Sequence, residues 1–314
     1  MSKSLQMAQV IVVLFLACLP FRQTNGQTSD KIMINGLRLN QIQVIGTHNS
    51  YHLSPEPKLL ELIAAASERA AEAIDYSHTP IARQLNELGI RQLELDIYAD
   101  PQGGLFAKPI GKSLIGKTTA DARMDFDFQS VMSKPGMKII HSPGFDYATT
   151  VPTLIDALKQ IQDWSESNPL HVPILVLIEL KEDVTGPAGV KPIAFNAELL
   201  DAIDAEIRSI VPLDGMLTPD LVRGEFETLR SAIIERGWPT LADSETRQAR
   251  SNDTTQRVRA LASGAQFVST DYPEPDTRFS EYCVRLENKA VARANPVSHS
   301  DASRLAKIDL ELME

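Results

Sequence analysis

Cysteine is almost absent from this chain of 314 residues, which contains only two. Cys18 lies in an apolar N-terminal segment, so Cys283 is the only cysteine in the sequence that follows this segment. A single cysteine cannot form an intramolecular disulfide, and no disulfide framework can support the fold. The fold must therefore depend on its hydrophobic core, for which 43% hydrophobic residues provide ample material.

The sequence also lacks an apolar run of the roughly 20 residues that a membrane-spanning helix needs. The nearest approach is Val10 to Leu19, which follows Lys3 and precedes small and polar residues through Gly26. This order of charge, apolar core and processing region is typical of a secretory signal peptide, which we assign to residues 1–26. A lipid on Cys18 is the weaker alternative, because the residues ahead of it lack the usual leucine and small residue. The sequence thus predicts a secreted or periplasmic protein without a transmembrane anchor.

Basic residues are too few to balance the acidic ones, with 31 Lys and Arg against 41 Asp and Glu. Removal of residues 1–26 takes away Lys3 and Arg22 and no acid, which leaves 29 basic and 41 acidic residues and a net charge of −12. Such a chain is a poor nucleic-acid binder, since that binding rests on Lys and Arg at phosphates. The acidity suits a secreted protein that recruits divalent cations, and no protein partner is implied.

No Pro-, Gly- or Ser-rich linker and no internal repeat divides the chain, so we expect one catalytic domain over 27–275 and a C-terminal tail over 276–314. Strand-like runs alternate with helical ones, which is typical of a parallel α/β sheet. Five strands are expected, at Ile42–Gly46, Gln92–Tyr98, Met137–His141, Ile174–Leu180 and Gln266–Thr270. Helices are expected at 57–74, 81–88, 151–164, 195–210, 226–236 and 245–263.

Polar side chains gather at or near the carboxyl ends of these strands. Residues two apart on a strand share a face, so Glu94 and Asp96 project together, as do Glu179 and Lys181. A buried carboxylate is costly unless a cation or a hydrogen-bond network receives it. Open α/β folds and barrels place their sites at these strand ends. With Asn49 after the first strand, the sequence predicts a shared cation site.

The candidate ligands of this cation all offer oxygen, which favours hard Ca²⁺ or Mg²⁺ over zinc. They are Asn49, Glu94, Asp96 and Glu179. Calcium suits them better than magnesium, because it accepts roughly 6–8 ligands in a relaxed geometry and leaves room for water and substrate.

Two histidines follow expected strands and supply proton-transfer groups. His48 and His141 can take and give protons near neutral pH, and a metal can lower the pKa of an attacking hydroxyl. Together with the carboxylates they supply the residue types of a metal-assisted phosphodiester-cleaving site. The other histidines are expected to be surface or loop groups; they are His52, His78, His171 and His299. For His52 and His78 a role stays open, because of their proximity to the predicted site.

Several long segments carry a resemblance to a known family. They are Gln43–His52, Asp75–His78, Arg91–Asp100, Ile174–Asp183 and Gly264–Pro273. Through them the chain resembles the secreted calcium-dependent phosphatidylinositol-specific phospholipase C family of bacteria and fungi, within the superfamily of barrel phosphodiesterases. The likeness extends from about Asn40 to about Pro296.

The resemblance implies a TIM-type barrel that cleaves an inositol phospholipid at a membrane surface into diacylglycerol and inositol phosphate through a cyclic phosphate. It implies that His48 and His141 form an acid/base pair and that Lys181 contacts the substrate phosphate. It also implies a calcium site, whose ligands would be Asn49, Glu94, Asp96 and Glu179. In that mechanism the inositol 2-hydroxyl attacks phosphorus and one histidine protonates the departing glycerol oxygen.

The sequence departs from the family in two places. Gly144 stands where the family more often has an acidic residue, and the segment near 242–253 lacks the several strands that the family usually has there. Residues 182–265 show no strand pattern, and five strands cannot close the eight-stranded barrel. We therefore expect a TIM-barrel-like α/β phosphodiesterase fold that is incomplete or open.

Three functions remain open from the sequence. The leading hypothesis is a secreted Ca²⁺-dependent phosphoric diester hydrolase acting on phosphatidylinositol-type lipids. A glycerophosphodiester phosphodiesterase shares the barrel and the histidine–carboxylate chemistry, but its usual His-Arg-Gly start differs from Gly46-Thr-His-Asn-Ser50. The third alternative is a pseudoenzyme that keeps the calcium site for structure.

Overall fold

The computed structural model describes residues 11–16, 33–34, 37–116, 121–182, 190–218, 241–243 and 246–297. Its strands are β1 (Ile11–Leu16), β2 (Met33–Ile34), β3 (Leu37–Arg38), β4 (Ile42–Thr47), β5 (Gln92–Asp100), β6 (Gly136–Ile139), β7 (Ile174–Leu180), β8 (Leu241–Asp243), β9 (Phe267–Thr270) and β10 (Ala292–Ala294). Its α-helices are α1 (Pro57–Ala66), α2 (Glu68–Ile74), α3 (Ile81–Glu87), α4 (Ile110–Leu114), α5 (Phe128–Met132), α6 (Leu154–Ser167), α7 (Ala197–Ile210), α10 (Thr246–Arg250) and α11 (Thr255–Ala262).

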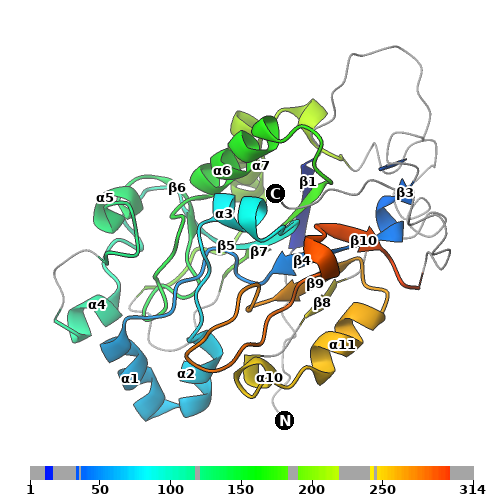
Figure 1. Cartoon of the computed structure of the whole chain (residues 1–314). Coiled ribbons are helices and arrows are strands. Elements are labelled where there is room, and N and C mark those ends of the chain that lie inside the picture. Colours follow the sequence, from blue (N-terminus) through cyan, green and yellow to red (C-terminus); the bar gives the residue numbers. More distant parts are fainter. Residues whose placement is uncertain are drawn as a thin grey trace, which may run out of the picture.

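One mixed sheet forms the centre of the molecule (Figure 1). Its strands follow the order β1-β7-β5-β4-β9-β8, with β6 added to β5 and β10 added to β4. The β5–β7, β4–β5, β4–β9 and β8–β9 pairs are parallel. Strand β1 lies at one end of this order and β8 at the other, and no pairing within the described residues joins them. The expectation of an open α/β sheet in place of a closed barrel is confirmed.

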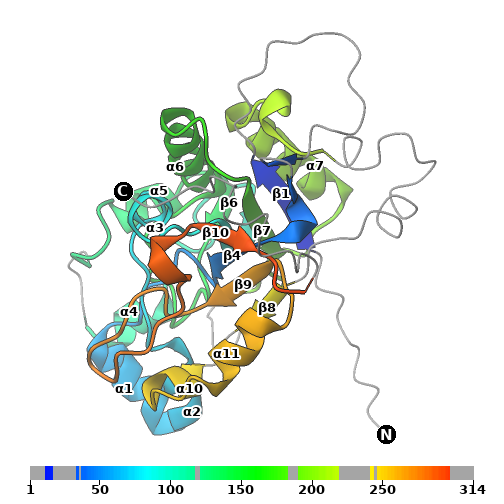
Figure 2. The ribbon, with the colours of Figure 1, turned by 45° about the vertical axis from the view of Figure 1, so that its right-hand side comes forward.

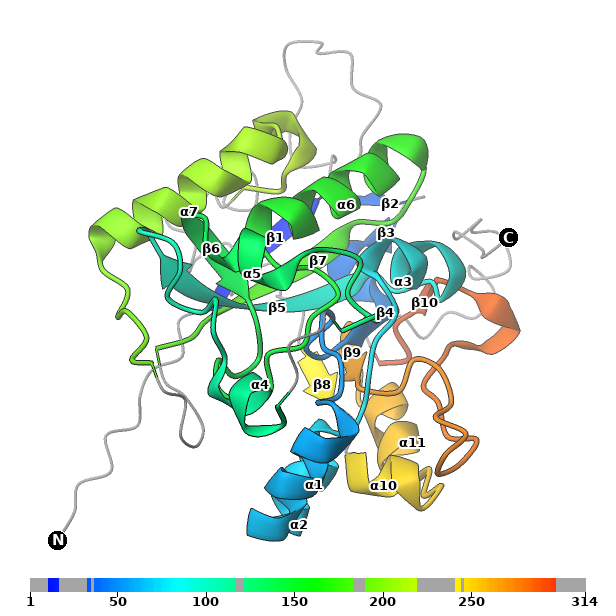
Figure 3. The same ribbon diagram turned by 90° about the vertical axis from the view of Figure 1, so that its left-hand side faces the viewer.

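Alternation along the strands divides the core into two sides of the sheet. Leu93, Leu95 and Ile97 of β5 pack in the main hydrophobic cluster with α3, α6 and α7. The intervening residues Glu94 and Asp96 project to the opposite face. Figure 3 shows α6 and α7 on one side of the sheet, and α1, α2, α10 and α11 toward the other. The polar strand residues therefore face away from the main apolar core.

Helix α6 shows how the sequence specifies the covering layer. The Thr153 side chain accepts a hydrogen bond from the Asp156 backbone N–H and caps the helix. Leu154, Leu158 and Ile161 then recur at helical spacing and are buried against the sheet. The helix expected over 151–164 therefore forms, but it starts at its cap and extends to Ser167.

All five expected strands are present, and two of the expected helices are interrupted. The helix expected over 57–74 breaks at Ser67, whose extended backbone ends α1 and whose side chain accepts from the Ala70 N–H to begin α2. The helix expected over 245–263 divides into α10 and α11 around Asn252, which has a positive φ of 55°. The helix expected over 226–236 lies outside the described residues.

Two strand expectations were wrong. Strand β6 runs antiparallel to β5, with Ile139 opposite Ile97, so the sheet is mixed and not parallel throughout. Strand β8 falls inside 182–265, where the sequence shows no strand pattern, because three residues are too few to show alternation. The segment expected as a C-terminal tail contributes β10, which pairs antiparallel with β4, and it buries Tyr282 and Val284.

Strand β1 belongs to the segment that the sequence assigns to a signal peptide. It pairs antiparallel with β7 from Ile11 opposite Glu179 to Leu16 opposite Ile174. Figure 2 shows it beside β7. Its backbone thus covers the β7 edge in this structure. Among the helices of the described residues, none has the length and apolar character that a membrane crossing requires.

Candidate active site

The end of β4 delivers His48 and Asn49 into a tight turn. Asn49 has a φ of 45°, in the left-handed region that asparagine tolerates better than most residues. The backbone N–H of His52 donates to the Asn49 carbonyl at 2.8 Å, and the His48 N–H donates to the Thr270 carbonyl at 3.2 Å. These two hydrogen bonds close the turn and attach it to the end of β9.

Three carboxylates meet on the neighbouring strands. Asp96 of β5 lies directly beside Glu179 of β7 in the parallel register, and Glu94 lies two residues earlier on the same face as Asp96. One carboxylate oxygen of each lies within 4.8 Å of the others. Lys181 Nζ lies 3.1 Å from Asp96 Oδ2 and 3.5 Å from Glu179 Oε1. The structure therefore brings together four of the predicted site residues.

The chemistry of this cluster fits a hard divalent cation. Both carboxylate oxygens of Asp96 are buried and lack a well-oriented hydrogen-bond donor among the residues that the structure describes. Lys181 Nζ lies close to two of the three carboxylates, and His48 Nε2 lies 3.7 Å from the third, Glu94. A divalent cation among the three carboxylates would further offset their mutual repulsion and desolvation. Oxygen donors in this number suit Ca²⁺. Glu94, Asp96 and Glu179 could hold such an ion.

His48 forms a hydrogen-bonded pair with an aspartate that follows β9. Its Nδ1 lies 2.8 Å from Asp271 Oδ1, and its Nε2 lies 3.7 Å from Glu94 Oε1. Desolvation lowers the pKa of His48, but the hydrogen bond to Asp271 and the charges of Asp271, Glu94 and Asp96 outweigh it and raise that pKa to about 10. His48 is thus held beside the carboxylate cluster and responds to its charge.

His141 forms a second histidine–aspartate pair. It follows β6, and its Nδ1 lies 2.7 Å from Asp146 Oδ2. Asp146 is buried and also faces His52 Nε2, at 2.9 and 3.0 Å from its two oxygens. Burial favours a high pKa for Asp146, but the charge of His52 and the hydrogen bonds from both histidines lower it to about 2. Asp146 is therefore ionised at neutral pH.

Asn49 is held by two tyrosines. Its Nδ2 donates to the Tyr76 hydroxyl at 3.1 Å and lies 3.3 Å from His48 Nε2, while the Tyr51 hydroxyl donates to its Oδ1 at 3.3 Å. The Asn49 amide thus makes some of its hydrogen bonds within the protein. Its predicted role as a calcium ligand stays a prediction.

The sequence reasoning missed the partners of both histidines. Asp271 directly follows the last expected strand and lies 223 positions from His48, so only its place after a strand signalled it. Asp146 lies two positions after Gly144, where the family more often has an acidic residue, and it supplies a carboxylate to His141. His52 and His78 also belong to the site's surroundings, since the His78 Nε2–H donates to the His48 carbonyl at 2.8 Å.

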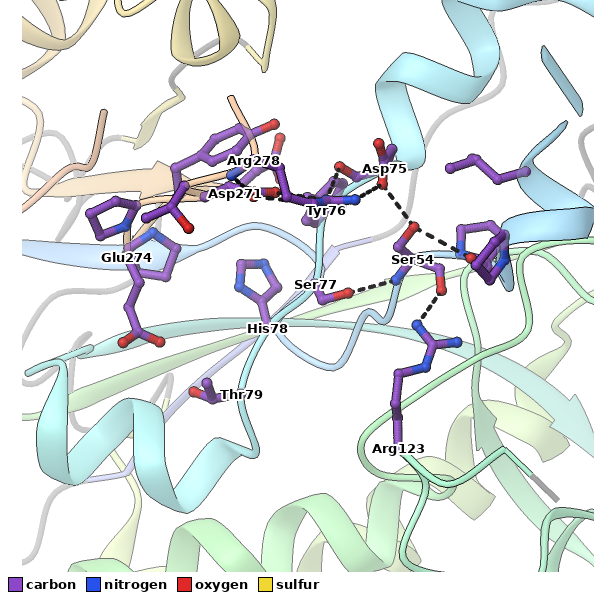
Figure 4. Close-up of a pocket in the computed structure, with 18 residues that line it drawn as sticks. Ser54, Asp75, Tyr76, Ser77, His78, Thr79, Arg123, Asp271, Glu274 and Arg278 are labelled. Atoms are coloured by element: carbon purple, nitrogen blue, oxygen red, sulfur yellow. Dashed lines mark hydrogen bonds and ion pairs between the residues drawn. The ribbon is translucent and has the colours of Figure 1, made fainter. Parts of the chain in front are cut away.

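A pocket of about 470 Å³ adjoins the first histidine pair, and Asp271 forms part of its wall (Figure 4). On another wall, Asp75 accepts hydrogen bonds from the Ser54 hydroxyl at 3.1 Å and from Arg278 at 2.9 Å. His78 also lines the pocket, and burial lowers its pKa to about 4, so its ring is neutral at physiological pH. The pocket combines charged, hydroxyl and ring groups next to Asp271.

Comparison with known proteins identifies the family. The sequence profile described as "Phosphoinositide phospholipase C, Ca2+-dependent" matches residues 37–246 and 240–296. The chain belongs to this calcium-dependent phosphoinositide phospholipase C family. The two matched segments meet near residues 240–246, next to the expected deletion.

Solved structures of a related enzyme are similar at low identity. The calcium-dependent phosphoinositol-specific phospholipase C of the Gram-negative bacterium Pseudomonas sp., in its myo-inositol complex, is 15% identical over 79% of this chain and 71% of that chain, with a TM-score of 0.36. A second crystal form of that protein is 16% identical over 78% and 70% of the two chains, with a TM-score of 0.36. No curated protein sequence gave a significant match.

Calcium binding is expected to lower the pKa of His48. The negative charges of Glu94 and Asp96 help to raise it to about 10, and a divalent cation between them would cancel that field and disfavour the imidazolium form. An NMR pH titration of the His48 ring should give a pKa lower by at least about 1 in saturating calcium than in chelator. The ring of His171, bonded to Ser165 in a different part of the fold, serves as the control. An unchanged His48 pKa would place the ion elsewhere.

Proposed function

We propose that this protein is a phosphoric diester hydrolase that cleaves phosphatidylinositol-type lipids into diacylglycerol and a cyclic inositol phosphate, which water can then open. Two histidine–aspartate pairs beside a cluster of three carboxylates carry this proposal. The family is one of calcium-dependent phosphoinositide phospholipases C, and the residue types at the site suit phosphodiester cleavage.

His48 is the proposed base. Its Nδ1–H donates to Asp271. With the charge of Glu94 and Asp96 offset by bound calcium, the His48 pKa would fall and the Nε2 lone pair could take the proton of the inositol 2-hydroxyl. The hydroxyl oxygen forms its bond to phosphorus as this proton moves to Nε2. Asp271 holds the tautomer that this step requires and stabilises the imidazolium that results.

His141 is the proposed acid. Its Nδ1–H donates to Asp146, so Nε2 carries the proton that the departing oxygen takes as the bond between phosphorus and the glycerol oxygen breaks. One proton enters at His48 and one leaves at His141, and the products are diacylglycerol and the five-membered cyclic phosphate. Attack of water on that cyclic phosphate, with the two histidine roles reversed, restores both residues.

The remaining residues bind and orient the substrate phosphate. Lys181, whose pKa is raised by Asp96 and Glu179 despite desolvation, is a cation suited to a phosphate oxygen. When bound by Glu94, Asp96 and Glu179, calcium would polarise the phosphoryl group and offset its negative charge. The pocket beside Asp271 offers hydroxyl and charged groups to a polyhydroxyl head group.

We also propose that the protein is secreted or periplasmic, on the basis of the N-terminal charge, apolar core and processing region. Cleavage after about Gly26 would remove β1 from the edge of β7. N-terminal sequencing of protein recovered from outside the cytoplasm tests this proposal, and a start before Ile11 on that protein would contradict it. A mature chain beginning with a lipid-modified Cys18 would support the anchored alternative.

Turnover of phosphatidylinositol is the direct test of the proposed function. In mixed micelles with calcium, the full chain should release diacylglycerol and cyclic inositol phosphate, and excess chelator should lower the rate at least about 10²-fold. Glycerophosphoinositol, assayed in parallel, distinguishes a glycerophosphodiester phosphodiesterase.

The open sheet favours one second candidate, a calcium-binding relative without turnover. In that case calcium would raise the unfolding temperature while neither substrate was cleaved. That pair of results would overturn the proposed activity.

A further inference from the structure

His52 is a completely buried histidine that links four parts of the site. Its ring stacks near Tyr76 with centroids 4.5 Å apart and meets the ring of His141 edge-on at 5.5 Å. Its backbone carbonyl accepts from the His78 N–H at 2.8 Å, and its backbone pairs with Thr149. His52 lies outside the calcium cluster and is not the histidine of either pair described above. It nevertheless contacts Asp146 of the second pair directly.

Both ring nitrogens of His52 face oxygens that accept hydrogen bonds. Nδ1 lies 3.1 Å from the Tyr76 carbonyl, and Nε2 lies 2.9 and 3.0 Å from the two oxygens of Asp146. A backbone carbonyl cannot donate, and an ionised carboxylate cannot donate either. Satisfying both contacts therefore requires an N–H at each ring nitrogen. The hydrogen bond from Nδ1 to the Tyr76 carbonyl orients the ring so that the Nε2–H points at Asp146.

The carboxylate of Asp146 accepts hydrogen bonds from both histidines. His52 Nε2–H spans both of its oxygens, while Oδ2 also accepts from His141 Nδ1 at 2.7 Å. The backbone holds the carboxylate's base in place, because Ser142 and Asp146 exchange two backbone hydrogen bonds of 2.8 and 3.2 Å. The side chain of Asp146 is thus fixed from behind by His52 and presents Oδ2 to His141.

We propose that His52 is a positioning residue for the reaction: it fixes the carboxylate of Asp146, which holds the proton of His141 on Nδ1 and turns His141 Nε2 toward the departing oxygen. This proposal rests on the proposed function for its kinetic consequence, but the hydrogen-bond arrangement can be tested without turnover. The cluster of His52, His141 and Asp146 also has the donor types of a transition-metal site. The hydrogen bond at each His52 nitrogen opposes that alternative, because a metal ligand needs a free lone pair.

Two substitutions separate the contacts of His52. In His52→Gln the amide nitrogen reaches the place of Nε2 and can still donate to Asp146, whereas in His52→Asn it reaches only the place of Nδ1 and can donate to the Tyr76 carbonyl. We therefore expect His52→Asn to lower kcat for phosphatidylinositol about 30-fold and His52→Gln to lower it less than about 5-fold, as part of a general-acid contribution is lost. Glutamine also fills more of the space of the imidazole ring than asparagine does, so a comparison of leaving groups is needed to separate positioning from packing.

The leaving group gives a second, independent comparison. An aryl ester of inositol phosphate releases a phenoxide that needs little help from an acid, so His52→Asn should lower its kcat less than about 3-fold. His171→Gln, a change at a buried histidine bonded to Ser165 in another part of the fold, controls for histidine loss in a core. All variants are compared as folded proteins, well below their unfolding temperatures. Equal losses with both substrates would overturn the proposal.

Nitrogen NMR of the histidine rings decides the arrangement even if the chain cleaves neither substrate. At a pH high enough for the His141 ring to be neutral, wild type and His52→Gln should both show its remaining proton on Nδ1, and His52→Asn should show that preference reduced. A proton preference that is the same in all three proteins would overturn the positioning role. Stoichiometric binding of added Zn²⁺ with changes at both His52 and His141 would overturn it in favour of a metal site. Absence of turnover with these spectra as expected would reject the proposed function alone.

Discussion

Replacing His48 with alanine is expected to lower kcat/KM for phosphatidylinositol about 10³-fold or more, because the proposed base is removed from the attacking hydroxyl. The alanine also leaves Asp271 without the imidazole at 2.8 Å and opens the space beside Glu94. The loss should fall mainly on kcat, since His48 is proposed to act on the transition state and to contribute little to holding the lipid. Product release measured over a range of substrate concentrations gives both constants.

The control for this variant is its calcium response. Glu94, Asp96 and Glu179 are unchanged in His48→Ala, so calcium should still raise its unfolding temperature. A variant that keeps its calcium response and loses turnover has lost a reacting group and not the fold. Full activity in His48→Ala would remove this residue from the mechanism.

Replacing Asp96 with asparagine is expected to abolish most of the stabilisation by calcium. Asp96 is the most buried carboxylate of the cluster, lies beside Glu179 in the sheet register and lies on the same face as Glu94. At a calcium concentration about 100 times the dissociation constant, wild type should gain about 2.7 kcal/mol, or roughly 5–10 °C in unfolding temperature. Differential scanning calorimetry with calcium and with chelator measures this gain, which should fall to less than about 2 °C in Asp96→Asn.

The matched control is Asp201→Asn, which removes the same charge from an exposed position on α7. This protein should keep the whole calcium-dependent shift, since a surface carboxylate outside the cluster contributes little. A comparable shift in Asp96→Asn and wild type would mean that calcium binds without the β5–β7 carboxylates.

Local sequence pattern predicted the strands that carry the site, because their alternation involves residues close in the chain. Glu94 and Asp96 are two apart on a strand, so their shared face follows from the geometry of any strand. The meeting of these two with Glu179 also required that β5 and β7 be parallel neighbours, although β6 lies between them in the chain. The three predicted carboxylates of the metal site therefore came together as expected.

The partners that His48 and His52 find across the fold could not be predicted in the same way. Asp271 reaches His48 only because β9 lies next to β4, and Asp146 reaches His52 only because the loop after β6 folds against the turn after β4. These contacts join residues 223 and 94 positions apart, for which no local periodicity exists. The antiparallel direction of β6 was missed for the same reason, since strand direction depends on the neighbour and not on the strand's own residues.

The sequence by itself determined the chemistry available to this protein: His48 and Asn49 after one strand, and Glu94 with Asp96 on another. Those features depend on residue identity and spacing, which short segments carry. Only the tertiary structure decided that the sheet stays open between β1 and β8, and that Asp271 reaches His48 and Asp146 reaches His52. Those features depend on which distant segments pack together, because the sheet order and the loop contacts are set by the burial of the whole core.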